Sequence, residues 1–185
     1  MTYDLYSYRH STKTPSTEEA ISVISSEEDS TFRDDKEARE IKEKIAGLIL
    51  ELNPKLERFQ IDYEQVCKTQ DISMEEARAR LNHIELNPLD GDLAVQLTIY
   101  WDHVCLTFPY WYAGPQQEAV FELALGYLRA IRKAEGFFAY DPQTDVAFDP
   151  GELHFLDRSS YSRIINNLPQ ILAQGEAKQP WWKFW

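Results

Sequence analysis

Residues 93–108 read LAVQLTIYWDHVCLTF, and this stretch decides the fold. Apolar side chains occupy every second position on both sides of a short polar turn: Val95, Leu97 and Ile99 before it, then Val104, Leu106 and Phe108 after it. Each of the first three is followed by a residue that would point to the opposite side, Gln96, Thr98 and Tyr100. Two alternating runs joined by a polar turn predict an antiparallel hairpin with one buried face.

Two amphipathic helices are predicted, one before this hairpin in the sequence and one after it. From Lys36 onward, apolar residues recur at spacings of three and four until Asn53-Pro54, where the residue before proline leaves the helical region. After the hairpin, Gly114-Pro115 opens a second helix, and Gly136 closes it as a C-terminal cap.

Shorter patterns complete the predicted order. We expect helices from Glu18 to about Ser25, from the Ser73 cap to about Leu81 and from Tyr161 to about Asn167, and strands over Tyr3–Arg9, Ile84–Pro88, Phe137–Tyr140 and Val146–Phe148. Residues 58–63 fit a short strand or an irregular link. The predicted class is therefore α+β, a mainly antiparallel sheet with helices packed on one face. Residues 1–150 would form a single domain, and residues 151–185 a C-terminal extension with an aromatic tail.

Composition excludes several classes of protein. The 185 residues include 31 acidic and 19 basic side chains, so the net charge is −12, which argues against partners such as nucleic acid or an anionic membrane. No run approaches the ~18 apolar residues of a membrane span, and the N-terminus does not resemble a secretory signal, so we expect a cytoplasmic protein. Two cysteines cannot build a disulfide framework or a zinc cluster.

Half of the net charge lies between Ser16 and Glu51, where five bases face eleven acids, 5 − 11 = −6. One interpretation is a solvated helix face with a polar loop. The other is a surface that docks on a basic partner, because such a field accelerates association. The candidate residues for docking are Glu27, Glu28, Asp29, Asp34 and Asp35.

Catalytic motifs are missing from the sequence. The four histidines form no metal-binding spacing, and neither a glycine-rich phosphate loop nor a GxSxG elbow occurs. Asp90 and Asp92 flank Gly91 without the further ligands of a calcium loop. We therefore expect a non-enzyme with no catalytic residue, no metal and no cofactor. His103, beside Asp102 in the predicted turn, is the residue on which an enzymatic alternative would depend.

Two aromatic groups admit either a structural or a binding role. Each could pack against its own domain, or serve as a partner hot spot, since Trp and Tyr dominate such sites. The groups are Tyr110, Trp111 and Tyr112 after the hairpin, and Trp181, Trp182 and Trp185 in the tail.

Three segments together resemble a group of small bacterial proteins that begin MSYD/ELYFW and carry a late YDPQTG. The segments are MTYDLY at residues 1–6, residues 95–112, and YDPQTD at residues 140–145. Many such proteins look like immunity proteins encoded beside polymorphic toxins. Here Ser7-Tyr8 stands where an aromatic pair is usual, and Asp145 replaces the glycine.

The resemblance implies a non-enzymatic immunity protein that neutralises a cognate, basic protein toxin by binding it. A small carboxylate-based hydrolase and an adaptor that binds through the aromatic tail are the alternatives. The sequence leaves the oligomeric state open.

Overall fold

The computed structural model describes residues 2–25, 33–89, 93–109, 112 and 114–152. The chain divides after Glu152, and all of these residues belong to its first part. They form five helices, α1 (Thr17–Ile24), α2 (Lys36–Leu52), α3 (Tyr63–Gln70), α4 (Met74–Arg80) and α5 (Pro115–Glu135), and seven strands, β1 (Thr2–Tyr8), β2 (Leu56–Arg58), β3 (Ile84–Pro88), β4 (Gln96–Ile99), β5 (His103–Pro109), β6 (Phe138–Asp141) and β7 (Val146–Phe148). The predicted helix near residues 161–167 lies outside the described residues.

The seven strands form one antiparallel sheet in the order β2-β3-β4-β5-β1-β6-β7. The first strand of the sequence is inserted near the middle, between β5 and β6. The predicted hairpin is present as β4 and β5, with Ile99 aligned to Val104. The α+β class and its antiparallel sheet are thus confirmed.

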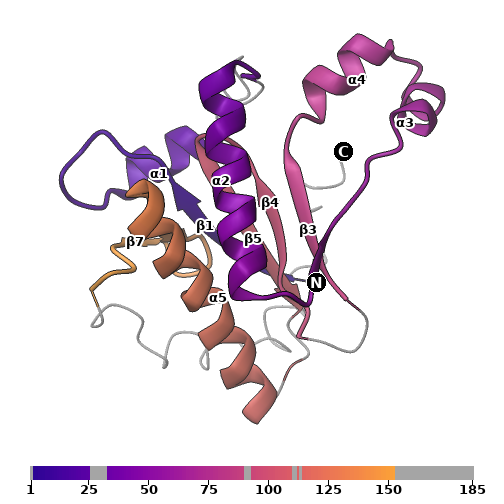
Figure 1. The fold of residues 1–185 in the computed structure, drawn as a ribbon. Helices are drawn as coiled ribbons and strands as arrows, with labels where there is room; N and C mark the ends of the chain where they lie inside the picture. Colours follow the sequence, from indigo (N-terminus) through magenta and orange to yellow (C-terminus); the bar gives the residue numbers. More distant parts are fainter. Residues whose placement is uncertain (1, 26–32, 90–92, 110–111, 113, 153–185) are drawn as a thin grey trace, which may run out of the picture. The chain divides into compact units, whose positions relative to one another are not determined.

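One face of the sheet forms the main core. Leu5, Leu106, Leu97 and Leu86 lie in register across β1, β5, β4 and β3, and all four are fully buried. Figure 1 shows α2 and α5 side by side in front of the sheet. Burying each such leucine contributes about 1.5–3 kcal/mol, so this row anchors both helices to the sheet.

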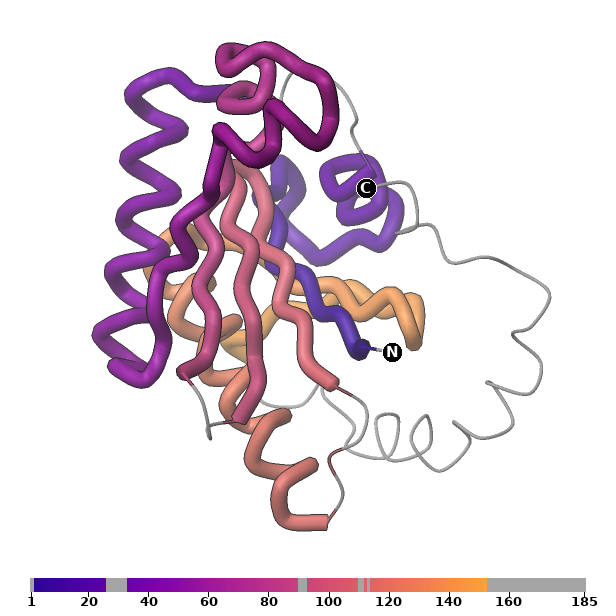
Figure 2. Tube along the Cα trace, turned by 90° about the vertical axis from the view of Figure 1, so that its right-hand side faces the viewer, coloured from indigo at the N-terminus to yellow at the C-terminus, as the bar shows by residue number. Residues whose placement is uncertain are grey.

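The predicted placement of the helices on one face is wrong for α1. Tyr6, Tyr8, Phe138 and Tyr140 project from the opposite face of the sheet and pack against Ala20 of α1. Figure 2 shows α1 on the side of the sheet opposite α2. The reason is that β1 buries large side chains on both of its faces, Tyr3 and Leu5 on one and Tyr6 and Tyr8 on the other.

The end signals of the helices act as predicted, with one omission. Ser73 accepts from the Glu76 N–H as the cap of α4, and Gly136 closes α5 with φ of 76°. Helix α3 was not predicted from the sequence; Asp62 caps it by accepting from the Gln65 N–H. Of residues 58–63, Arg58 ends strand β2, residues 59–62 form an irregular link, and Tyr63 begins α3.

Candidate functional site

The face of the sheet opposite α2 and α5 carries mostly polar side chains on β3, β4 and β5 and the start of β1. The register aligns Tyr6 with Cys105, Cys105 with Thr98, and Thr98 with Glu85. In Figure 2, none of the described helices crosses β3, β4 or β5 on the side turned toward the viewer. We call this surface the open face because no described helix covers these three strands there; of its side chains Glu57 is exposed, Tyr6 and His103 are buried, and the others are partly buried. Its members are Asp4, Tyr6, Glu57, His83, Glu85, Asn87, Gln96, Thr98, Tyr100, His103, Cys105 and Thr107.

A row of rings lies on the open face beside the turn between β4 and β5. The Tyr100 ring stacks on His103 with centroids 4.4 Å apart, and His83 lies 5.3 Å from its centroid. Each histidine also contacts a carboxylate: His83 Nε2 lies 3.0 Å from Glu85 Oε1, and His103 Nδ1 lies 2.9 Å from Asp102 Oδ1. An ionised carboxylate only accepts hydrogen bonds, so these two ring nitrogens donate. The contacts fix the orientation of both imidazoles.

His83 carries a buried ring nitrogen without a partner. Its side chain is 8% exposed, and its Nδ1 has no hydrogen bond within the described part of the chain. Because Nε2 donates to Glu85, Nδ1 of the neutral ring is an acceptor. An unsatisfied buried polar atom costs about 1–3 kcal/mol, which marks this position as a place where a donor is missing.

Burial shifts the pKa values of several groups on this face. Burial raises the pKa of Asp4 above its usual value, and hydrogen bonds from Thr107 and Thr2 oppose the rise. Burial also raises the pKa of Tyr100 to about 12 and that of Cys105 to about 12. Cys105 therefore remains a thiol at neutral pH, and a thiolate nucleophile is not available there.

The strands contribute no positive side chain to the open face. Among β1 to β5 the sequence holds a single lysine or arginine, Arg58. Its guanidinium bonds Glu43 of α2 at 2.6 Å, on the other side of the sheet. The open face thus presents the carboxylates of Asp4, Glu57 and Glu85 without a lysine or arginine among its members.

The acid-rich region behaves differently, because seven of its eight described acids, all except Glu51, have a hydrogen-bond or ion-pair partner within the described part of the chain. Residues 16–25 and 33–51 carry five bases and eight acids, 5 − 8 = −3. Asp34 pairs with Arg39 at 3.2 Å and with Lys42 at 3.6 Å. Asp35 caps α2 by accepting from the Ala38 N–H at 2.9 Å and also pairs with Arg33. These two candidates hold α2 together, while Glu27, Glu28 and Asp29 lie outside the described residues.

Of the aromatic candidates, only Tyr112 is described. Its hydroxyl accepts from the Ala94 N–H at 2.8 Å, which fastens the chain ahead of β4. The others lie outside the described residues: Tyr110, Trp111, Trp181, Trp182 and Trp185.

Trp101 lies in the turn of the hairpin and is not among the candidate residues predicted from the sequence. The guanidinium carbons of Arg9 and Arg33 lie 5.2 and 4.8 Å from its ring centroid. Arg33 also bonds Glu37 of α2 at 2.7 Å. Cation–π contacts of this kind contribute about 0.5–1 kcal/mol at exposed sites, so the turn is tied to the beginning of α2.

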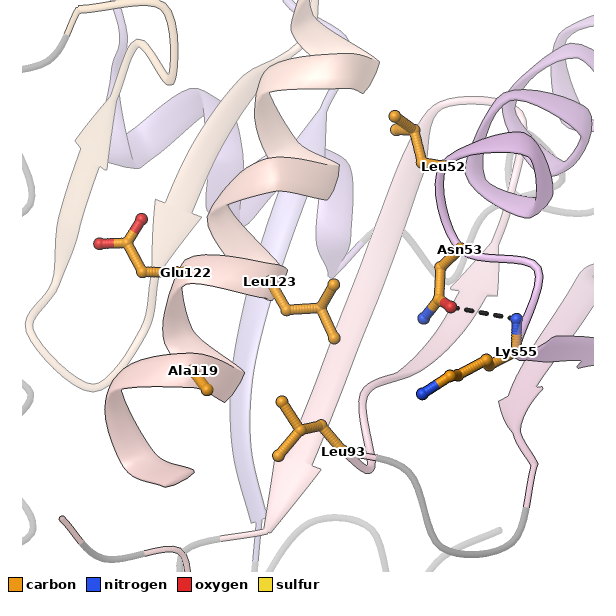
Figure 3. A pocket seen from close by; sticks show the side chains of 7 residues that line it. All are labelled: Leu52, Asn53, Lys55, Leu93, Ala119, Glu122 and Leu123. Carbon is orange, nitrogen blue, oxygen red and sulfur yellow. Dashed lines mark hydrogen bonds between the residues drawn. The ribbon is translucent and has the colours of Figure 1, made fainter. Parts of the chain in front are cut away.

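A shallow pocket lies away from the open face, between the end of α2 and the first half of α5. Its volume is about 490 Å³, and Figure 3 shows Leu93 and Leu123 pointing toward one another across it. His103 is not among its lining residues, which are Leu52, Asn53, Lys55, Leu93, Ala119, Glu122 and Leu123. In the described ranges, no group of three or more His, Cys, Asp or Glu side chains could hold a metal ion.

Comparisons with protein-family models, curated proteins and solved structures give no match. No helix in the described ranges has the length and apolar character needed to cross a membrane.

Proposed function

We propose that this chain is a non-enzymatic immunity protein that binds and neutralises a basic bacterial toxin in the cytoplasm. The observation that carries the proposal is the open face, which holds the carboxylates of Asp4, Glu57 and Glu85 and has no lysine or arginine among its members. The net charge of −12 and the resemblance of residues 1–6 and 140–145 to immunity-like proteins support it.

A basic partner fits these charges on physical grounds. Complementary potentials steer two proteins together and raise the association rate, most strongly at low salt. An acidic surface can also occupy the cationic cleft with which a nuclease binds its substrate. Nucleic acid and anionic membranes would instead be repelled by a chain of this charge.

The test is co-expression with the product of the adjacent gene. We expect this chain to restore growth of cells that make that product, and we expect the two purified proteins to form a complex whose association slows as salt rises. Two triple variants that each remove three carboxylates test which surface binds. D4N/E57Q/E85Q on the open face should weaken the complex, whereas E37Q/E40Q/E51Q on α2 should leave it largely unchanged. Absence of both protection and a complex would overturn the proposal.

A second candidate, a small hydrolase, is favoured by one contact. Asp102 Oδ1 lies 2.9 Å from His103 Nδ1, the arrangement in which a carboxylate orients a histidine acting as general base. His103 is 5% exposed, so a substrate would have to reach it through the open face. Hydrolysis of generic ester, phosphodiester or peptide substrates by the parent chain, and its loss in H103A, would establish this candidate instead.

A further inference from the structure

We propose that His83 and Glu85 on the open face form a subsite for a cationic N–H donor, the guanidinium or ammonium group of a basic partner. The inference rests on the proposed function, since it names where such a partner would place an arginine or lysine. Binding at this pair of side chains can be measured with a basic peptide, without the toxin.

The hydrogen bonding of His83 is incomplete on one side only. Nε2 donates to Glu85 Oε1 at 3.0 Å, and this contact leaves Nδ1 as the acceptor of the neutral ring. Nδ1 is buried and without a partner in the described chain, on a side chain that is 8% exposed. An incoming N–H group would supply the missing donor. An anion would not, because it could only accept and would meet Glu85.

The carboxylate of Glu85 is arranged to receive the charge of the same group. Its side chain is 24% exposed, so one part contacts His83 while another remains accessible. Thr98 lies beside it on β4, and the next position on that face is Tyr100. A guanidinium suits this setting, because it is planar, offers several donors and packs against aromatic rings.

The neighbours of His83 hold the subsite in shape. Tyr100 lies between His83 and His103, with centroid distances of 5.3 and 4.4 Å. Asp102 in turn fixes His103. A donor would therefore meet rings whose positions are already set, which lowers the entropy lost on binding.

The charge around the subsite points to a cation as well. Glu57 lies on the adjacent strand β2, opposite Asn87, and so adds a second carboxylate to the face beside Glu85. A metal ion is a poorer fit, since no set of three possible ligands exists among the described side chains.

The experiment uses the ¹⁵N-labelled full chain and a synthetic nonaarginine peptide at neutral pH. We expect amide shift changes centred on Glu85, Thr98 and Tyr100. We also expect the ring-nitrogen spectrum of the free protein to show His83 protonated on Nε2, with the Nδ1 signal moving as peptide is added. Changes confined to α1 and α2, or no changes at all, would overturn the proposal.

Two variants and one matched control give a second measurement. E85Q removes the carboxylate charge, and H83F keeps a ring against Tyr100 while removing the acceptor. Each should weaken the peptide affinity at least fivefold, whereas E51Q, which removes an exposed carboxylate on α2, should change it less than twofold. If E85Q and E51Q lowered the peptide affinity equally, the binding would be general electrostatic attraction, and the proposed subsite would be refuted.

The outcome also separates the two proposals. If the peptide maps to His83 and Glu85 while the adjacent gene product is not bound, the subsite stands and the immunity function fails. If protection against that product survives in both E85Q and H83F, the subsite fails and the immunity function stands.

Discussion

The hydroxyl of Tyr3 donates a 2.5 Å hydrogen bond to a carboxylate oxygen of Asp141, joining residues 138 positions apart in the sequence. Both side chains are buried, with exposures of 1% and 4%. Tyr3 belongs to the opening MTYDLY segment and Asp141 to the YDPQTD segment, two of the short motifs from which the proposed relation to immunity proteins was inferred. The motifs therefore contact each other inside the fold, so their shared role is to join β1 to the end of β6.

Substituting Tyr3→Phe should destabilise the protein. The change removes a donor from a buried carboxylate, and a hydrogen bond to a charged group contributes about 1.5–3 kcal/mol. The control is Tyr140→Phe, which removes a 3.0 Å bond to the exposed Asp145 and should cost about 0.5–1.5 kcal/mol. Urea unfolding followed by circular dichroism measures both, and equal losses would contradict the ranking.

Position 145 should tolerate glycine and reject a β-branched residue. Asp145 has φ of 57°, in the left-handed region where Asp is tolerated and Val is strained. Asp145→Val should cost about 1–3 kcal/mol, whereas Asp145→Gly should remain within about 1 kcal/mol of the parent. Thermal unfolding tests the pair, and a glycine variant as unstable as the valine variant would show that the Tyr140 contact matters more than the backbone.

Glu19 should titrate far below an ordinary glutamate. Burial raises its pKa, but hydrogen bonds from Ser11 and Thr12, at 2.6 and 2.7 Å, outweigh burial and lower it to about 2. A depressed carboxylate pKa gives stability that is present above the ordinary value of 4.5 and is lost as pH falls toward about 2. A carbon-13 carboxylate titration should show this, and Ser11→Ala should raise the midpoint. The exposed Ser22→Ala serves as the control.

Replacing Arg132 with lysine should destabilise the protein. It bonds both carboxylate oxygens of Asp149 at 2.9 and 2.6 Å, and its guanidinium carbon lies 4.5 Å from the ring centroid of Phe138. Lysine keeps the charge but not the two-pronged contact, so Arg132→Lys should cost about 1–3 kcal/mol.

The same pair predicts an acid-dependent loss of stability. The hydrogen bond from Arg132 lowers the pKa of Asp149 below its ordinary value of 3.8. The resulting stability is present above that value and disappears as pH falls through the depressed one. Unfolding free energies measured from neutral pH down to about pH 2 should fall less steeply in Arg132→Met than in the parent. Parallel curves would show that the pair contributes nothing in acid.

Periodicity alone located the larger elements. The hairpin has a strong two-residue pattern, and α2 and α5 have strong 3.6-residue patterns. The sequence also contains residues that end these two helices, Asn53-Pro54 for α2 and Gly136 for α5. α3 was missed because Tyr63–Gln70 is only eight residues long and none of its residues is fully buried, so the helix is too short to repeat an apolar spacing over several turns. The side of α1 could not be predicted either, because an alternating strand with aromatics on both faces does not say which helix covers which face.

Only part of the candidate site could be predicted from the sequence. Alternation predicted that Gln96, Thr98 and Tyr100 share a side, which is one strand of the open face. Their meeting with Glu85 and Asp4 depends on the registers of β3 with β4 and of β1 with β5. The run of acids between Ser16 and Glu51 drew attention by its density, yet Asp34 and Asp35 are paired with bases on or beside α2.

The sequence by itself determined the class of the fold, the hairpin, the two long helices and the net charge of −12, because these depend on local periodicity and on composition. Tertiary structure alone decided the strand order, the insertion of β1 between β5 and β6, and the grouping of His83, Glu85, Tyr100 and His103 on one face. Strand pairing joins residues far apart in the chain, and its energy comes from contacts that no local pattern records. The acid-rich run at residues 16–51 was therefore a poorer guide to the candidate surface than Asp4, Glu57 and Glu85. These three carboxylates come from separate strands and share the open face with no lysine or arginine.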